Sequence, residues 1–232
     1  MERIDRLTSV PFIQETALML SSLPPIVLLS LYVSGLALIS ATVIGLPLGA
    51  GLALRPVPGQ RFIVLLIYTG MGLPPVVVGL AVYMLLSRSG PLGGLNWLFT
   101  PPAMITAQTI IALPLVIGLT MTAVEGVDPA LRLQVRALGA TPAQVMGAVL
   151  HEARTGVMAA IVAAFGGIIS EVGAVMLVGG NIAGKTRVLT TAIVLETRQG
   201  DFELALALGG VLLGLAFVSN FLLLRLGRLA GR

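Results

Sequence analysis

The sequence DPALRLQVRALGATPAQVMGAVLHE, at residues 128–152, is a polar stretch with the pattern of a small folded unit. Long runs in which charged residues are almost absent lie on both sides of it. Apolar runs of about 20 residues predict membrane-spanning helices, because charged side chains are strongly disfavoured in the hydrocarbon of a bilayer. We therefore interpret residues 128–152, which we call the polar unit, as a helical element at a membrane surface between two spans.

The composition of the whole chain also indicates that lipid is its solvent. Of the 232 residues, 56% are hydrophobic and 10% are charged, and the mean hydropathy is +1.02. Soluble domains carry about 25% charged residues. The absence of cysteine and the single histidine, His151, exclude disulfides, thiolate metal sites and any site that needs two imidazoles from one chain. The net charge of +4 is scattered, so we expect no metal site and no nucleic-acid partner.

Five apolar runs are long enough to cross a bilayer. Pro24 and Pro25 divide the first run, and the part before them is too short to span, so we expect it to lie as a helix at the interface. The chain is thus predicted to be an all-α integral membrane protein with one transmembrane domain, residues 1–232. The expected spans are residues 26–54, 62–86, 103–124, 155–178 and 204–224.

Basic residues are distributed unequally between the two sides that these spans define. Eight of the 14 lysines and arginines lie on the side of the polar unit and the C-terminus, and six lie on the other side. Under the positive-inside rule, this bias predicts the polar unit and the C-terminus in the cytoplasm and the N-terminus outside. Residues 179–203 then form an external loop.

The polar unit carries two helix-start signals separated by a glycine. Asp128, followed by proline, reads as an N-cap, and Thr141 repeats the same pattern. Gln144, three residues after Thr141, completes a capping box. Gly139 is placed to end the first helix in a left-handed conformation. The pattern predicts a helix–turn–helix that docks on a cytoplasmic partner, with an amphipathic connector as the alternative.

The polar unit resembles a loop of the permeases of binding-protein-dependent ABC importers, whose motif reads E-A-A-x-x-x-G-x9-I-x-L-P. Gly139 matches the glycine and Val149 stands at the isoleucine, whereas residues 133–135 and 151–152 depart from the motif. Most of the chain is similar to the oxyanion branch, which transports sulfate, molybdate and tungstate, and HEAR at 151–154 is most similar to tungstate permeases. The stretches that resemble this branch are LPPVVVGL (73–80), SRSGPLG (87–93), AQTIIALPLVIGLT (107–120), SEVGAVMLVGGNI (170–182) and TRQGDFELALALG (197–209).

This resemblance implies the type I ABC importer permease fold and a set of partners. The chain would form a homodimer in a prokaryotic inner membrane, with two cytoplasmic ABC ATPase subunits and an external substrate-binding protein. ATP and Mg²⁺ would be bound by the ATPase, so this chain would need no cofactor and would not be an enzyme. We expect tungstate as the substrate, with molybdate or sulfate as alternatives. The residues expected to dock on the ATPase are Arg136, Ala137, Leu138, Gly139, Ala140, Thr141, Pro142 and Gln144.

Glu171 is the only charged residue inside an expected span. It is a functional candidate because an intramembrane acid is unfavourable by about 2.5–3.5 kcal/mol on insertion scales. Its charge opposes direct binding of an anion, which leaves a structural or gating hydrogen bond and, alternatively, a proton relay in a secondary transporter. The candidates for lining or gating the pathway are Pro74, Pro75, Thr106, Gln108, Thr109, Ser170 and Glu171.

Residues 179–186, GGNIAGKT, fit the P-loop motif letter for letter. A P-loop follows a strand in a soluble α/β domain, whereas this sequence follows a span on the external side. We therefore interpret it as a glycine-rich external turn. The residues expected to contact the binding protein are Gly180, Asn181, Lys185 and Arg187.

Overall fold

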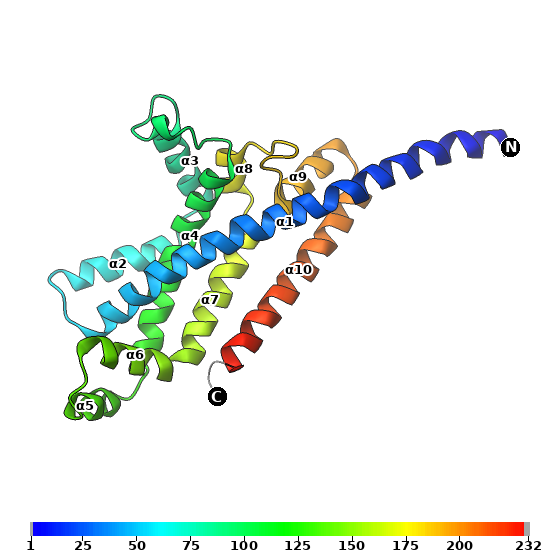
Figure 1. Cartoon of the computed structure of the whole chain (residues 1–232). Helices are drawn as coiled ribbons and strands as arrows, with labels where there is room; N and C mark the ends of the chain where they lie inside the picture. Colours follow the sequence, from blue (N-terminus) through cyan, green and yellow to red (C-terminus); the bar gives the residue numbers. More distant parts are fainter. Residues whose placement is uncertain (1, 230–232) are drawn as a thin grey trace.

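The computed structural model describes residues 2–229, and it describes their side chains from Leu23 to Arg225. Within this part all the regular secondary structure is helical, which confirms the predicted all-α membrane fold (Figure 1). The elements are α1 (Glu2–Leu54), α2 (Gln60–Met71), α3 (Pro75–Leu86), the 3-10 helix η1 (Gly93–Leu95), α4 (Pro101–Glu125), α5 (Pro129–Ala137), α6 (Pro142–Glu152), α7 (Arg154–Ile169), α8 (Gly173–Gly179), α9 (Leu189–Gln199) and α10 (Phe202–Leu229).

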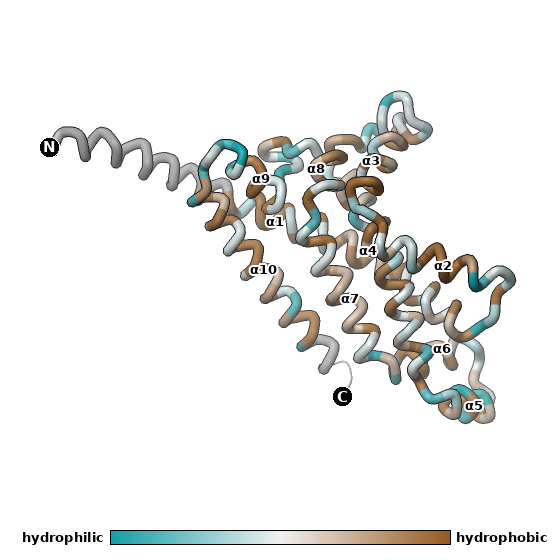
Figure 2. The backbone as a smooth tube through the Cα atoms, turned by 180° about the vertical axis from the view of Figure 1, so that it is seen from behind, coloured by the Kyte–Doolittle hydropathy of each residue, from teal (hydrophilic) through white to brown (hydrophobic). Residues whose placement is uncertain are grey.

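Three helices are long and apolar enough to cross a membrane: α1 from residue 23, α4, and α10 to residue 225. Two bent pairs also qualify, α2 with α3 at 102° and α6 with α7 at 75°, so the number rises to five if each pair is one span. In Figure 2, hydrophobic residues follow the helices, and hydrophilic residues gather at α5 and in the connections.

Helix α1 corrects the prediction that Pro24 and Pro25 divide the first run, because it continues through both prolines without a break. A proline inside a helix removes a backbone donor and usually kinks or breaks the helix, which is why Pro24 and Pro25 predicted a division that α1 does not have. The interfacial segment expected before Pro24 precedes the residues whose side chains the structure describes.

Two of the expected spans are broken rather than continuous, and the first break lies at the pathway candidates Pro74 and Pro75, where paired prolines favour a bend. The span at residues 62–86 is interrupted at residues 72–74, between α2 and α3, and the span at 155–178 is interrupted at 170–172, between α7 and α8. The outer segments, α3 and α8, pack tightly together. A Cβ placed on Gly79 would lie 2.5 Å from the Cα of Ala174, so only glycine allows this approach.

The expected external loop at residues 179–203 is also more ordered than predicted, because it contains the 11-residue helix α9. The first turn of α9 is buried, and the N–H of Leu189 donates a hydrogen bond of 2.9 Å to Oγ of Ser30 in α1. The hydroxyl of Thr191 accepts a 3.1 Å hydrogen bond from the N–H of Val188 and so caps the helix start. Helix α9 therefore fixes the outer part of the chain to α1.

Helix α4 is the centre of the packing, since it contacts α1, α2, α3, α7 and α8. Buried clusters follow it along its length, through Met104 at one end, Val116 in the middle and Val124 at the other end. Close contact with α1 depends on Gly49, where a Cβ would lie 2.6 Å from the carbonyl oxygen of Ile117. Helix α10 lies at the periphery, against α7 and α9.

Candidate functional site

The polar unit lies at one end of the molecule. Figure 1 shows α5 and α6 beside the end of α1 and the start of α7, at the end of the molecule where α10 also finishes. Helices α3, α8 and α9 lie toward the opposite end. This arrangement agrees with the two sides that the charge distribution predicts.

The local structure of the polar unit has the predicted caps. Oδ1 of Asp128 accepts a 2.8 Å hydrogen bond from the N–H of Ala130. The N–H of Thr141 donates to Oε1 of Gln144 over 2.8 Å, and the N–H of Gln144 donates to Oγ1 of Thr141 over 3.4 Å, which makes the capping box. Gly139 has φ +83°, in the left-handed region that favours glycine. The turn between α5 and α6 is therefore set by its own sequence.

The polar unit is packed firmly onto the helices that enter the membrane. Val145 and Val149 of α6 are buried in one cluster with Ala50 of α1 and Val124 of α4. Nη2 of Arg132 in α5 donates a 3.0 Å hydrogen bond to the carbonyl of Val124, at the end of α4. A displacement of α5 and α6 is therefore transmitted directly to α1 and α4, because close-packed interiors deform little.

The predicted docking residues share one surface at the end of α5 and the start of α6. Seven of the eight are exposed, and Ala140 is half-buried. Leu138 is 87% exposed at the turn, so a large apolar side chain projects from this surface. Arg55 lies in the same recess as Arg136, and the sequence analysis did not select it. Its position directly after an apolar run was the available signal.

The break between α7 and α8 is held by two of the predicted pathway residues. Nε2 of Gln108, buried in α4, donates a 2.8 Å hydrogen bond to the carbonyl of Ile168. Oε1 of Glu171 accepts a 2.9 Å hydrogen bond from the N–H of Ala174, at the start of α8. The carbonyl of Glu171 accepts a further 3.0 Å bond from Oγ1 of Thr190 in α9. The carboxylate therefore caps a half-helix inside the expected span.

The break between α2 and α3 lies close to this one. Pro74 is exposed and precedes α3, and Pro75 is its first residue. A Cβ on Gly173 would lie 2.4 Å from Cγ2 of Val76 and 3.5 Å from Oε1 of Glu171, so the starts of α3 and α8 meet. The structure thus brings Pro75 and Glu171 into one region.

The other pathway candidates use their hydroxyls within their own helices. Oγ1 of Thr106 donates to the carbonyl of residue 102 over 2.9 Å, and Oγ1 of Thr109 donates to that of residue 105 over 2.8 Å. Oγ of Ser170, which is exposed, donates to the carbonyl of residue 166 over 2.8 Å. These three hydroxyls therefore satisfy local backbone acceptors.

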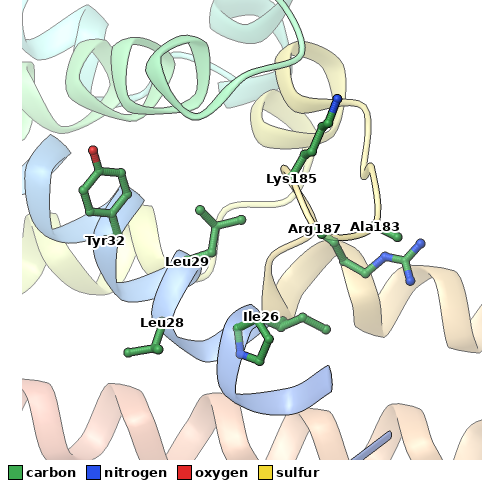
Figure 3. Close-up of a pocket in the computed structure, with 9 residues that line it drawn as sticks. Ile26, Leu28, Leu29, Tyr32, Ala183, Lys185 and Arg187 are labelled. Atoms are coloured by element: carbon green, nitrogen blue, oxygen red, sulfur yellow. The ribbon is translucent and has the colours of Figure 1, made fainter. Parts of the chain in front are cut away.

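The external candidates separate into two places. Lys185 and Arg187 line a cavity of about 460 Å³, opposite Leu28, Leu29 and Tyr32 of α1 (Figure 3). Gly180 and Asn181 do not line this cavity. Gly180 ends α8 at φ +72°, and Asn181, at φ +51°, has a buried Oδ1 without a hydrogen-bond partner.

The P-loop sequence has a structural use of its own. It follows α8, a helix rather than a strand. The hydroxyl of Thr186, which a P-loop would present to Mg²⁺, is buried. It donates a 2.6 Å hydrogen bond to the carbonyl of Gly179 and accepts a 3.0 Å bond from the N–H of Ile182. The hydroxyl of Thr186 therefore links the backbone of Gly179 to that of Ile182 within the loop.

Comparison with known proteins assigns the chain to a family of transport proteins. The family model described as "Binding-protein-dependent transport system inner membrane component" matches residues 41–230. The chain belongs to this family. The predicted resemblance to ABC importer permeases is thereby confirmed.

Several curated relatives of this permease are named for anions. The chain is 45% identical to the probable anion ABC transporter permease protein of Haloferax volcanii. The match extends over 208 residues, which are 88% of this chain and 90% of the relative. The chain is 40% identical to the tungstate uptake system permease protein TupB of Peptoclostridium acidaminophilum, over 195 residues that are 84% of this chain and 86% of the relative. The chain is 30% identical to the molybdenum transport system permease protein ModB of Escherichia coli K12, over 185 residues that are 75% of this chain and 81% of the relative.

Solved structures show the same fold for the permease. The MetNI methionine ABC transporter, in an inward facing conformation, matches with a TM-score of 0.74 over 92% of this chain and 98% of the solved chain. The sequence identity is 19%, so this likeness concerns the fold alone. It confirms the predicted ABC importer permease fold.

Proposed function

We propose that this permease translocates an oxyanion across a prokaryotic cell membrane, with tungstate as the preferred substrate. The observation that carries the proposal is the 40% identity to a tungstate uptake permease, which extends over 84% of the chain. The anion permease that is 45% identical supports the same class of substrate. Molybdate and sulfate are the alternatives to be tested.

The distribution of charge suits a pathway that passes an anion without trapping it. No lysine or arginine lies within the five expected spans, at residues 26–54, 62–86, 103–124, 155–178 and 204–224. A dianion therefore meets no fixed cation at mid-depth that would hold it tightly. Selectivity then resides in an external binding protein, which delivers the substrate to the outer end of the permease.

A second copy of the permease would complete the pathway. Helix α2 is apolar and has no buried residue within one chain. Phe62, Leu65 and Tyr68 are between 47% and 63% exposed and follow one another along α2. Soluble monomers rarely expose a continuous apolar face of this kind. Lipid and a second copy together would cover this face in a homodimer.

The polar unit would connect the permease to two ABC ATPase subunits in the cytoplasm. The unit's exposed turn offers the contact surface, and its buried face passes motion to α1, α4 and α7 through one apolar cluster. ATP and Mg²⁺ would be bound by the ATPase, with no cofactor on this chain. The C-terminus would then lie in the cytoplasm and the N-terminus outside. Coupling of this kind needs contacts that differ between the two states of the ATPase.

The alternative of a proton-coupled secondary transporter depends on Glu171. Its carboxylate already accepts the N–H of Ala174, which gives the acid a structural use as a helix cap. The family to which the chain belongs is defined by dependence on a binding protein, which favours the ATP-driven mechanism.

Substrate choice can be tested in proteoliposomes that contain the permease, its ATPase and its binding protein. Tungstate, molybdate and sulfate are supplied singly and in competition, and calorimetry measures the affinity of each for the binding protein. We expect tungstate to be taken up at the lowest concentration and to compete with the other two anions. Uptake of sulfate in preference to tungstate would contradict the assignment, and uptake of none of the three would refute oxyanion transport.

A further inference from the structure

The polar unit lies between two recesses of opposite charge. A recess of about 430 Å³ is lined by Arg55, Arg136 and residues from the first turn of α6, and it contains no acidic side chain. A recess of about 530 Å³ is lined by Asp128, Glu152 and neighbours from α4 and α7, and it contains no basic side chain. Each of the two recesses is therefore lined by charged side chains of one sign.

Three of these four charged groups are free to meet a partner. Arg55, Arg136 and Glu152 are exposed, and no hydrogen bond from their side chains is found among the described residues. Asp128 is exposed as well, but its Oδ1 already caps α5. Glu152 is therefore the principal free charge of the acidic recess.

Helix α6 reinforces this separation of charge, because its two ends lie in the two recesses. Thr141 and Pro142, at its start, line the basic recess, and Glu152, its last residue, lines the acidic one. The start of a helix carries a partial positive charge and the end carries a partial negative charge. At about 1.5 Å per residue, the 11 residues of α6 make a helix about 16 Å long.

We propose that these recesses receive charged side chains of the ABC ATPase subunit, an acidic one beside Arg55 and Arg136 and a basic one beside Glu152. The inference rests on the proposed function, and it adds what fixes the orientation of the ATPase on the permease. The exposed apolar side chains of Leu133 and Leu138 supply contact area, but an apolar contact is non-directional. Opposite charges in recesses at the two ends of a helix about 16 Å long admit one direction of docking and disfavour the reverse.

The pairing of signs favours a protein partner over the membrane. An anionic lipid headgroup would be attracted to Arg55 and Arg136 but repelled from the recess at Glu152. A folded protein surface can present both charges at a fixed separation. The ATPase is the partner that the proposed function brings to this face.

Charge reversal tests the inference with the permease in nanodiscs and its own ATPase subunit in solution. We expect Arg55→Glu and Glu152→Lys each to weaken ATPase binding at least tenfold and to change its dependence on salt. The matched control is Arg61→Glu, an equal charge change six positions further on, at an exposed residue that lines a different hollow. The control should bind within about twofold of the wild type, since an isolated exposed charge contributes little.

The outcomes separate this inference from the proposed function. Absence of ATPase binding by the wild type would refute the proposed function itself. Normal binding by the wild type with equal affinities for Arg55→Glu and Arg61→Glu would overturn the inference and leave the function standing. A defect of Arg55→Glu that disappears in nanodiscs without anionic lipid would assign the basic recess to a headgroup and also overturn the inference. Arg55→Ala and Glu152→Gln, with smaller expected defects, keep the test valid if a reversal impairs folding.

Discussion

Substitution of Gly139 by valine tests the role of the turn between α5 and α6. The φ of Gly139 is +83°, and its N–H donates a 2.9 Å hydrogen bond to the carbonyl of Arg136. A Cβ at this position would meet nothing within 4 Å, so a side chain has room and only the backbone is strained. The left-handed conformation is unfavourable by about 1–2 kcal/mol for a residue with a Cβ, and β-branching adds to this.

We expect Gly139→Val to reduce ATP-driven uptake by about tenfold, because about 1.4 kcal/mol changes an equilibrium by that factor. Uptake and ATP hydrolysis are measured together in proteoliposomes with the ATPase and the binding protein. The membrane helices should assemble normally, since the strain is confined to the exposed turn. Gly139→Asn should recover most of the uptake, because asparagine tolerates the left-handed region.

Gly147 provides a matched control within the polar unit. It lies inside α6, and a Cβ there would also meet nothing within 4 Å. Valine has a helix propensity no worse than that of glycine, so Gly147→Val should leave uptake near the wild-type level. Normal uptake by Gly139→Val, or equal defects in the two variants, would refute the account of this turn.

Four further substitutions test the two broken spans. Glu171→Gln should leave uptake within about twofold of the wild type because it retains an acceptor for the N–H of Ala174, whereas Glu171→Leu should destabilise the permease by about 1–3 kcal/mol. Gln108→Glu should destabilise it by several kcal/mol, since it removes the donor to Ile168 and places a carboxylate in a buried site. Gly79→Val should disrupt the contact of α3 with α8, because its Cβ would lie 2.5 Å from the Cα of Ala174.

The stability of each variant is measured by thermal unfolding of the protein in detergent, and its transport is measured as uptake. Gly209→Val is the control for the glycine substitution, since a Cβ there would meet nothing within 4 Å. Loss of uptake by Glu171→Gln with normal assembly would contradict the capping role and support an ionic one. A stable, active Gln108→Glu or Gly79→Val would show that the contacts at these breaks are not needed.

The local structure of the polar unit could be predicted because its signals lie within a few residues of one another. Asp128 caps the helix that follows it, Thr141 and Gln144 cap each other, and the left-handed turn needs only Gly139. The all-α membrane fold followed in the same way from the uninterrupted apolar runs. These features depend little on the rest of the chain.

The break between α7 and α8 depends on contacts between segments distant in sequence, and hydropathy does not detect it. The interruption at residues 170–172 is held by Gln108 from α4 and by Thr190 from α9. Helix α9 was missed because its threonines and charged residues read as a polar connector, although its first turn is buried against α1. Arg55 was missed because its neighbour Arg136 is 81 positions away.

The central claim is that an ATPase, acting through the polar unit, drives an oxyanion through this permease. The most direct test measures tungstate uptake and ATP hydrolysis together in proteoliposomes that hold the permease, its ATPase and its binding protein, with an uncoupler present. The account predicts uptake that requires ATP and the binding protein, survives the uncoupler, and falls in Gly139→Val but not in Gly147→Val. Uptake that needs no ATPase and is abolished by the uncoupler would contradict it.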